Sequence, residues 1–169
     1  MLAGLRAAAY GNPFQPVRGF KGSDIPERSG IQTFDDPYTG EMLYAIPALA
    51  PDWAIIHVQE ANANGDARIL GPRYFDVEMT QAAKGVIITA EKIVPDEVFI
   101  DEPEMTAVPG SMVSAVVEAP GGAAPCSCAH TYGVDEAGMR RYMELSTTAE
   151  GLKTYLEAED ANLAPEPLG

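Results

Sequence analysis

Polar side chains follow two apolar runs of this sequence, at points where buried strands would end. Trp53–Val58 is followed by the amide-rich segment Gln59–Gly65, and Gly85–Ala90 is followed directly by Glu91. Apolar runs without alternating polar residues are typical of parallel strands that are covered on both faces. Because ligands bind at the carboxyl ends of such strands, both ends are candidate contact points for a substrate. An ordinary strand-to-turn link, and for Glu91 a solvated loop acid, are the simpler alternatives.

Neutral amides and glycines dominate the candidate loops. Gln59 and Asn64 can donate hydrogen bonds to a carbonyl or a carboxylate without adding charge, and Gly65 closes their turn. Gly121 and Gly122 follow a further apolar strand, where they would let a ligand approach the backbone closely. A tight turn is the commoner reason for two successive glycines, so both explanations stay open.

Arg18 is the cation best suited to hold an acidic substrate. It lies in Gly11–Glu41, a long segment dense in Gly, Pro, Asp and Arg that we interpret as irregular. A guanidinium pairs well with a carboxylate or a phosphate, although pairing with a nearby surface aspartate explains it equally well. If Arg18 binds substrate, its loop should line one cleft with the Gln59–Gly65 and Gly121–Gly122 turns.

No metal site is predicted, although one set of side chains has ligand chemistry. Cys126, Cys128 and His130 alternate, and on an extended segment they would share one face. His57 could complete a four-ligand set with them. Short motifs of this kind carry a high false-positive risk, so a loop of small residues is the preferred interpretation. No Ser-His-Asp spacing or nucleophile elbow occurs either.

The composition favours one globular domain and argues against several partners. A chain of 169 residues, 46% hydrophobic, can bury a sizeable core, so we predict a single domain at residues 1–161 and a flexible tail at 162–169. The net charge of −14 disfavours nucleic acid. No apolar run reaches the roughly 18 residues of a membrane span. The two cysteines are too close to pair without strain, which favours a cytoplasmic location.

The pattern of apolar residues predicts an α/β fold with a mostly parallel sheet flanked by helices. We expect strands at Met42–Ile46, Trp53–Val58, Gly85–Ala90 and Ser111–Glu118, and helices at Leu2–Tyr10, Asp76–Lys84, Asp135–Ser146 and Thr148–Asp160.

Five segments carry a resemblance to a known family. In order they are Gly11–Gly19, Asp36–Glu41 with Ile46–Leu49, Ala54–Ala67, Val86–Val94 and Val117–Ala123. Together they resemble the alpha subunits of class I coenzyme A transferases, of the glutaconate CoA-transferase type. Asp66 replaces the asparagine usual after the glycine of the third segment. The likeness runs from about Leu5 to about Leu156. The Gly-rich half with which the family normally begins is absent, so the resemblance implies the C-terminal half of such a subunit.

This resemblance implies a reaction and a partner. The family moves CoA between an acyl-CoA and a free carboxylic acid, so a CoA thioester is the expected substrate and no covalently bound cofactor is expected. Its nucleophilic glutamate belongs to the beta subunit, so this chain should hold no catalytic residue and should join a beta-type partner in a hetero-oligomer. The candidate substrate-binding residues are Arg18, Gln59, Asn64, Gly65, Gly121 and Gly122.

Two alternatives stay open. The Glu118–Ala123 turn, with the residues after it, also resembles the alpha subunit of the CoA-ester ring-opening hydrolases of steroid catabolism. A non-catalytic remnant that only binds a partner is the second alternative. In each case an unpaired sheet edge and exposed strand faces would drive association.

Overall fold

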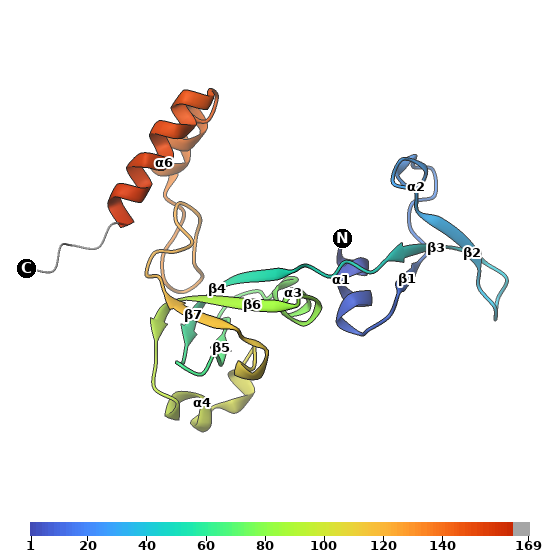
Figure 1. The fold of residues 1–169 in the computed structure, drawn as a ribbon, viewed down its shortest axis with the longest axis horizontal. Helices are drawn as coiled ribbons and strands as arrows, with labels where there is room; N and C mark the ends of the chain where they lie inside the picture. The colour runs from blue at the N-terminus through green and yellow to red at the C-terminus, as the bar shows by residue number, and fades with distance from the viewer. Residues whose placement is uncertain (164–169) are drawn as a thin grey trace, which may run out of the picture. The chain divides into compact units, whose positions relative to one another are not determined.

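The computed structural model describes residues 1–163, with side chains described to residue 159. Its internal contacts divide the chain into two compact units, Met1–Gly122 and Ala123–Gly169 (Figure 1). The single domain over residues 1–161 stays a prediction, and most of the expected tail at 162–169 lies outside the described residues.

A four-stranded sheet forms the centre of the first unit, in the order β5-β4-β6-β7. Strands β4 (Trp53–Ala61), β6 (Gly85–Ile93) and β7 (Ala115–Glu118) are parallel, and the short edge strand β5 (Ala67–Arg68) is antiparallel to β4. A parallel pair needs a crossover, and helix α3 (Asp76–Ala82) lies on the one between β4 and β6. The expected α/β fold is therefore confirmed, with a mixed sheet.

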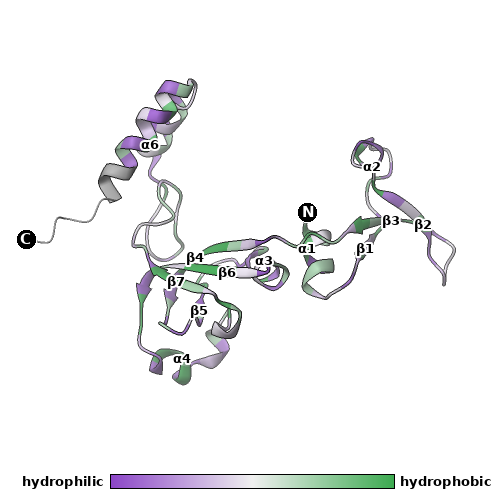
Figure 2. Ribbon diagram, viewed as in Figure 1, coloured by the Kyte–Doolittle hydropathy of each residue, from purple (hydrophilic) through white to green (hydrophobic). Residues whose placement is uncertain are grey.

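Among residues 1–159, whose side chains the structure describes, only one face of this sheet is covered throughout. Alternate residues point to opposite faces of a strand, so Ile56 and Val58 on β4 share the buried face with Ile88 and neighbouring apolar residues on β6. On the opposite face Ile55 is 67% exposed. The expectation of two covered faces, drawn from the unbroken apolar run, is wrong for this half of β4. Figure 2 shows the hydrophobic character along β4, β6 and β7.

A second, antiparallel sheet joins the strand expected at Met42–Ile46 to two strands within Gly11–Glu41, the segment that we interpreted as irregular. Strands β1 (Phe14–Val17), β3 (Met42–Pro47) and β2 (Gln32–Asp35) pair in the order β1-β3-β2, and helix α2 (Ile25–Arg28) lies in the connection. Strands β1 and β2, which we did not expect, have only four residues each. A strand of this length is too short to show a clear alternation of apolar and polar residues. Helix α1 (Leu2–Ala9) packs on this sheet and on α3.

A buried arginine anchors the acidic loop that follows β6. This loop contains α4 (Glu97–Asp101) and the 3₁₀ turns η1 (Pro103–Met105) and η2 (Gly110–Met112). Arg68 is 5% exposed, pairs with Glu102 at 3.0 Å, and donates to the Val98 carbonyl. Its guanidinium also lies 4.9 Å from the centre of the Phe99 ring. The loop is thus held to β5 by charge and by packing.

The second unit contains the two expected helices, α5 (Glu136–Leu145) and α6 (Ala149–Leu163). Asp135 caps α5 through hydrogen bonds from the amides of the first turn. The Tyr142 and Tyr155 rings meet edge to face at 5.3 Å and join the helices. None of the helices in residues 1–163 combines the length and apolarity needed to cross a membrane.

Replacing Arg68 tests this anchor. Arg68→Ala should lower the free energy of unfolding by about 2–3 kcal/mol, because charged hydrogen bonds are lost from a buried position. Arg28→Ala is the matched control: Arg28 pairs with Asp24 at 2.6 Å but is 80% exposed, and should cost less than about 1 kcal/mol. Chemical denaturation measures both, and equal losses would contradict the anchoring role.

Candidate functional site

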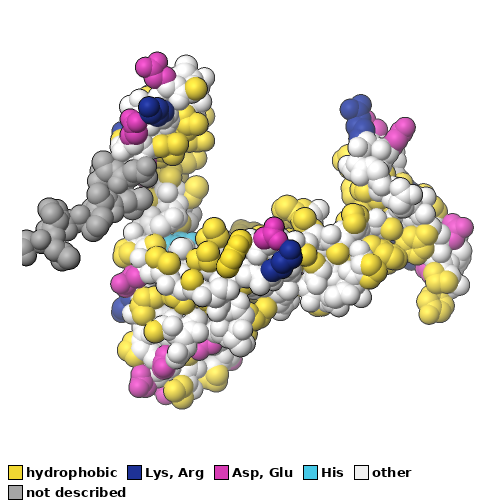
Figure 3. Space-filling model, viewed as in Figure 1, with side chains coloured by type: hydrophobic (Ala, Val, Ile, Leu, Met, Phe, Trp, Pro, Cys, Tyr) yellow, Lys and Arg dark blue, Asp and Glu magenta, His cyan; other side chains and the backbone are white. Residues whose placement is uncertain are grey.

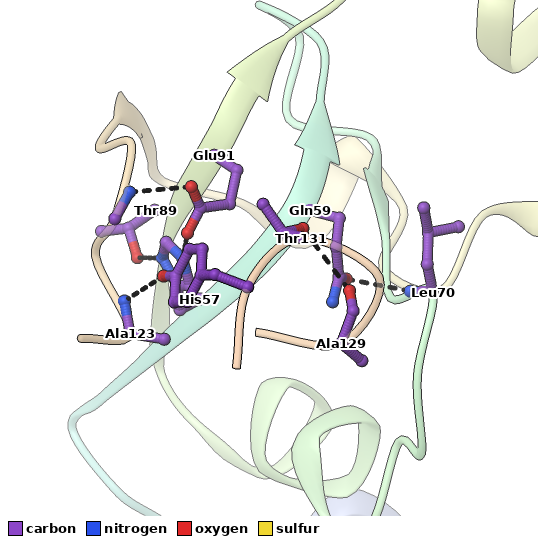
Figure 4. A network of polar contacts seen from close by, with 10 residues as sticks. His57, Gln59, Leu70, Thr89, Glu91, Ala123, Ala129 and Thr131 are labelled. Carbon is purple, nitrogen blue, oxygen red and sulfur yellow. Dashed lines mark hydrogen bonds and ion pairs between the residues drawn. The ribbon is translucent and has the colours of Figure 1, made fainter. Parts of the chain in front are cut away.

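A histidine and a glutamate meet on the less covered face of the four-stranded sheet. His57 on β4 lies opposite Thr89 in the parallel register with β6, and Glu91 lies two residues further on the same face. The His57 Nε2 atom is 2.7 Å from Glu91 Oε1, and its Nδ1 atom is 2.9 Å from Thr89 Oγ1 (Figure 4). Register alone therefore assembles three polar side chains on a largely apolar sheet.

The hydrogen-bond partners of His57 determine which of its ring nitrogens is the donor to Glu91. An ionised carboxylate only accepts, so Nε2–H donates to Glu91. Thr89 can either donate to a neutral Nδ1 or accept from a protonated one, because a hydroxyl does both. A proton can thus enter or leave His57 at Nδ1 while the bond to Glu91 persists. The arrangement can hold or transfer a proton, which is the elementary requirement of acid–base chemistry.

The glycine turn after β7 packs on this pair. The Gly121 amide donates to Glu91 Oε2 at 2.8 Å, with a φ of 76° that favours glycine. A Cβ atom on Gly122 would lie only 2.7 Å from His57 Cε1. Both glycines are needed for contacts within this chain. That a ligand also approaches these two glycines stays a prediction.

The candidate residues after His57 have structural partners. Strand β4 runs to Ala61, beyond its predicted end, so Gln59 lies in the strand, where its Oε1 atom accepts from the Leu70 amide at 2.9 Å. Asn64 lies in the turn, and its Nδ2 atom donates to Asp96 at 2.9 Å. Gly65 has a φ of 97°, and a Cβ there would lie 2.8 Å from that of Val113. The predicted start of the turn at Gln59 is therefore wrong.

Arg18 lies away from the other candidates. It follows β1 and pairs with Glu41 at 3.1 Å, with 68% of its side chain exposed. Figure 1 shows the three-stranded sheet at the opposite end of the first unit from the carboxyl end of β4. The structure does not bring the Arg18 loop to the two turns, so it does not show the shared cleft that we expected. A substrate contact for Arg18 stays a prediction.

Sequence reasoning missed Thr89 as a functional candidate and considered His57 only as a metal ligand. Both are polar residues inside apolar strands, at positions where an aliphatic side chain would be ordinary. A polar residue inside an apolar strand was the signal that could have identified His57 and Thr89. Their hydrogen-bond partners could not be predicted, because these depend on the register between the strands. Of the two cysteines in the alternating motif, Cys126 is exposed and Cys128 is buried. The expected absence of a metal stays a prediction.

The chain belongs to the coenzyme A transferase family, which it matches over residues 1–119. It is 36% identical to the A subunit of the glutaconate CoA-transferase of Acidaminococcus fermentans, over 88% of this chain and 52% of that one. It is also 36% identical to the cholesterol ring-cleaving hydrolase IpdA subunit of Mycobacterium tuberculosis, over 96% of this chain and 60% of that one. The chain thus spans about half the length of the curated relatives it matches.

Solved structures agree with this assignment. The glutaconate coenzyme A-transferase of Acidaminococcus fermentans superposes with a TM-score of 0.86 at 33% identity, over 93% of this chain and 55% of that one. A variant of the decarboxylase AibA/AibB superposes with a TM-score of 0.82 at 32% identity, over 95% of this chain and 58% of that one. The family and fold implied by the sequence resemblance are confirmed.

Adding a methyl group to the glycine turn tests its packing on His57. Gly122→Ala should cost about 1–3 kcal/mol of unfolding free energy, because the new Cβ forces the imidazole or the turn to move. It should also shift the His57 ring-nitrogen resonances measured by NMR. Gly19→Ala is the control, since no described atom lies within 4 Å of the added Cβ. Unchanged His57 resonances in Gly122→Ala would contradict this packing.

Proposed function

We propose that this chain acts as the alpha-type subunit of a CoA transferase that moves CoA between an acyl-CoA and a free carboxylic acid. The observation that carries the proposal is the His57–Glu91 pair under the Gly121 turn, in a chain of the coenzyme A transferase family. The turn follows a parallel strand, at the sheet edge where α/β proteins bind ligands. The CoA thioester is the proposed substrate, without a covalently bound cofactor.

The nucleophile is assigned to a beta-type partner. A carboxylate attacks a thioester most readily when few hydrogen bonds stabilise its negative charge. Each oxygen of Glu91 accepts a hydrogen bond, one from His57 and one from the Gly121 amide, and this stabilises the carboxylate and lowers its reactivity. Glu91 is therefore suited to positioning or to proton transfer. The partner's glutamate would attack the thioester carbonyl and expel CoA as a thiolate, leaving an acyl–glutamyl anhydride. The thiolate would then attack the glutamyl carbonyl, release the acyl group as a free carboxylate and leave CoA as a thioester on the glutamate. The acceptor carboxylate would take CoA from that thioester by the same two steps in reverse.

The substrate contacts proposed for this chain centre on the glycine turn. Gly121 and Gly122 adjoin the His57–Glu91 pair, and Gln59 lies on the same strand as His57. Asn64 and Gly65 belong to the turn at the end of that strand, where both also serve the fold. We place the complete enzyme in the cytoplasm as a hetero-oligomer, and the spacing of Cys126 and Cys128, too close for an unstrained disulfide with each other, supports this location.

A CoA-ester ring-opening hydrolase is the second candidate function. The His57–Glu91 pair favours this function as well. A carboxylate held beside an imidazole can transfer a proton without forming a covalent intermediate. A ring-cleaving hydrolase subunit is 36% identical to this chain, and so is a transferase subunit, so identity does not separate the two reactions. The two candidates differ in whether a CoA-linked enzyme forms.

Mass spectrometry of the complex with a beta-type subunit tests the proposal. After incubation with an acyl-CoA, a CoA thioester should appear on a glutamate of the partner and none on this chain. Turnover that produces no enzyme-bound CoA would favour the hydrolase. An adduct on Glu60, Glu91 or Glu136 of this chain would overturn the assignment of the nucleophile.

A substitution of Glu91 separates the two candidates further. Glu91→Gln keeps the shape but loses the charged acceptor. In a transferase the partner's thioester should still form, with a rate reduced about 10-fold to 100-fold as the turn loses a charged hydrogen bond. In a hydrolase whose proton transfer uses Glu91, turnover should fall by about 100-fold to 10,000-fold. Glu60→Gln is the control, because Glu60 pairs with Arg68 at 3.7 Å rather than with His57.

A further inference from the structure

Thr89 stands next to His57 on the sheet, and its hydroxyl has a single partner. The Oγ1 atom lies 2.9 Å from His57 Nδ1 and makes no other hydrogen bond within the described residues. Strand register places Thr89 between His57 of β4 and Val117 of β7, and the Val117 side chain offers no acceptor. Hydrophobic side chains also gather on the surface over β4 (Figure 3). The hydroxyl is therefore a polar group in largely apolar surroundings.

The available donors and acceptors select one protonation form of His57. If the imidazole is neutral with its proton on Nε2, Thr89 donates to Nδ1 and Nε2–H donates to Glu91, so the hydroxyl and both nitrogens are satisfied. A proton on Nδ1 alone would leave the Nε2 lone pair 2.7 Å from an ionised carboxylate. A doubly protonated ring would donate to the Thr89 oxygen, and the half-buried hydroxyl would then lack an acceptor among the described residues.

The same form fixes the plane of the ring against the glycine turn. Hydrogen bonds on both nitrogens prevent the imidazole from turning over, and the Cε1 atom between them would lie 2.7 Å from a Cβ on Gly122. This orientation directs Nε2–H to Glu91 Oε1, while Glu91 Oε2 accepts from the Gly121 amide. A continuous series of hydrogen bonds, all within Met1–Gly122, thus leads from Thr89 to the turn (Figure 4).

We propose that Thr89 is a positioning residue of this site: its hydroxyl holds His57 in the neutral Nε2–H form, and His57 in turn holds Glu91 and the Gly121–Gly122 turn in place. This role rests on the proposed CoA transferase function, in which the turn contacts the substrate. Thr89 acts through His57 and is assigned no substrate contact of its own. A β-branched side chain suits this task, because its χ1 angle is restricted and keeps the hydroxyl aimed at Nδ1.

Substitutions at Thr89 separate its hydroxyl from its shape. Thr89→Val is isosteric and removes the donor, whereas Thr89→Ser retains it. NMR of the ring nitrogens reports the form of His57, and because the chain has two histidines, His130→Asn identifies the His57 signals. In the unmodified chain Nδ1 should have the shift of an unprotonated nitrogen and Nε2 that of a protonated one. Thr89→Val should move the Nδ1 and Gly121 amide signals, and Thr89→Ser should return both towards their original positions.

Thr80 provides the matched control. Its hydroxyl donates to the Val77 carbonyl at 2.8 Å, and the residue is 2% exposed, so Thr80→Val also removes a hydroxyl from a buried position. Thr80→Val should lower stability and leave the His57 and Gly121 signals unchanged. If it moves these signals as far as Thr89→Val does, the network responds to stability alone and the positioning role is wrong.

Activity of the complex with a beta-type subunit tests the link to function. Thr89→Val should lower the rate of CoA transfer about 2-fold to 10-fold, as expected for one neutral hydrogen bond, and Thr89→Ser should restore it. A protonated Nδ1 in the unmodified chain, or unchanged signals in Thr89→Val, would overturn the positioning role and leave the proposed function intact. Moved signals with unchanged transfer would contradict a role of Thr89 in the reaction. A complex that transfers no CoA would overturn the proposed function, whereas the NMR signals would still test how Thr89 holds His57.

Discussion

The parallel register between β4 and β6 is the constraint on which the rest of the first unit depends. It pairs Ile56 with Ile88 on the buried face and His57 with Thr89 on the other. A slip of one residue would move an imidazole into the core and expose aliphatic side chains, so the hydrophobic effect fixes the register firmly. The polar network is therefore placed by the core behind it. The glycine turn can close over Glu91 only because β7 continues the same register.

The parts of the fold that were predictable are those with strong local patterns. The apolar runs identified β4 and β6, and 3.6-residue periodicity identified α5 and α6. The three-stranded antiparallel sheet was not predictable in this way, because its outer strands β1 and β2 have only four residues each. Its pairing depends on contacts between segments far apart in sequence, such as Phe14 with Pro47, which no local window contains.

The candidate site was also predictable only in part, because its contacts join residues that are far apart in the sequence. The strand ends indicated the glycine turn and Glu91, because the topology of parallel sheets places such ends at one edge. His57 was overlooked as a partner for Glu91, since two residues 34 apart in sequence meet only once the register is known. Arg18 shows the converse error. Its chemistry suits an acidic substrate, but chemistry does not place it, and β1 holds it near Glu41.

Overall sequence identity to the relatives does not select one reaction for this chain. Two relatives, one named as a transferase and one as a hydrolase, are each 36% identical to this chain, and a decarboxylase superposes at 32% identity. One scaffold thus accompanies three kinds of bond breaking, as expected when function depends on the site rather than on the fold. In this chain the His57–Glu91 pair can orient a group or hold a proton. Both oxygens of the Glu91 carboxylate accept a hydrogen bond, one from His57 and one from the Gly121 amide. Under the proposed function, what the beta-type partner places opposite this pair, a nucleophilic glutamate or a group that activates water, decides which bond is broken.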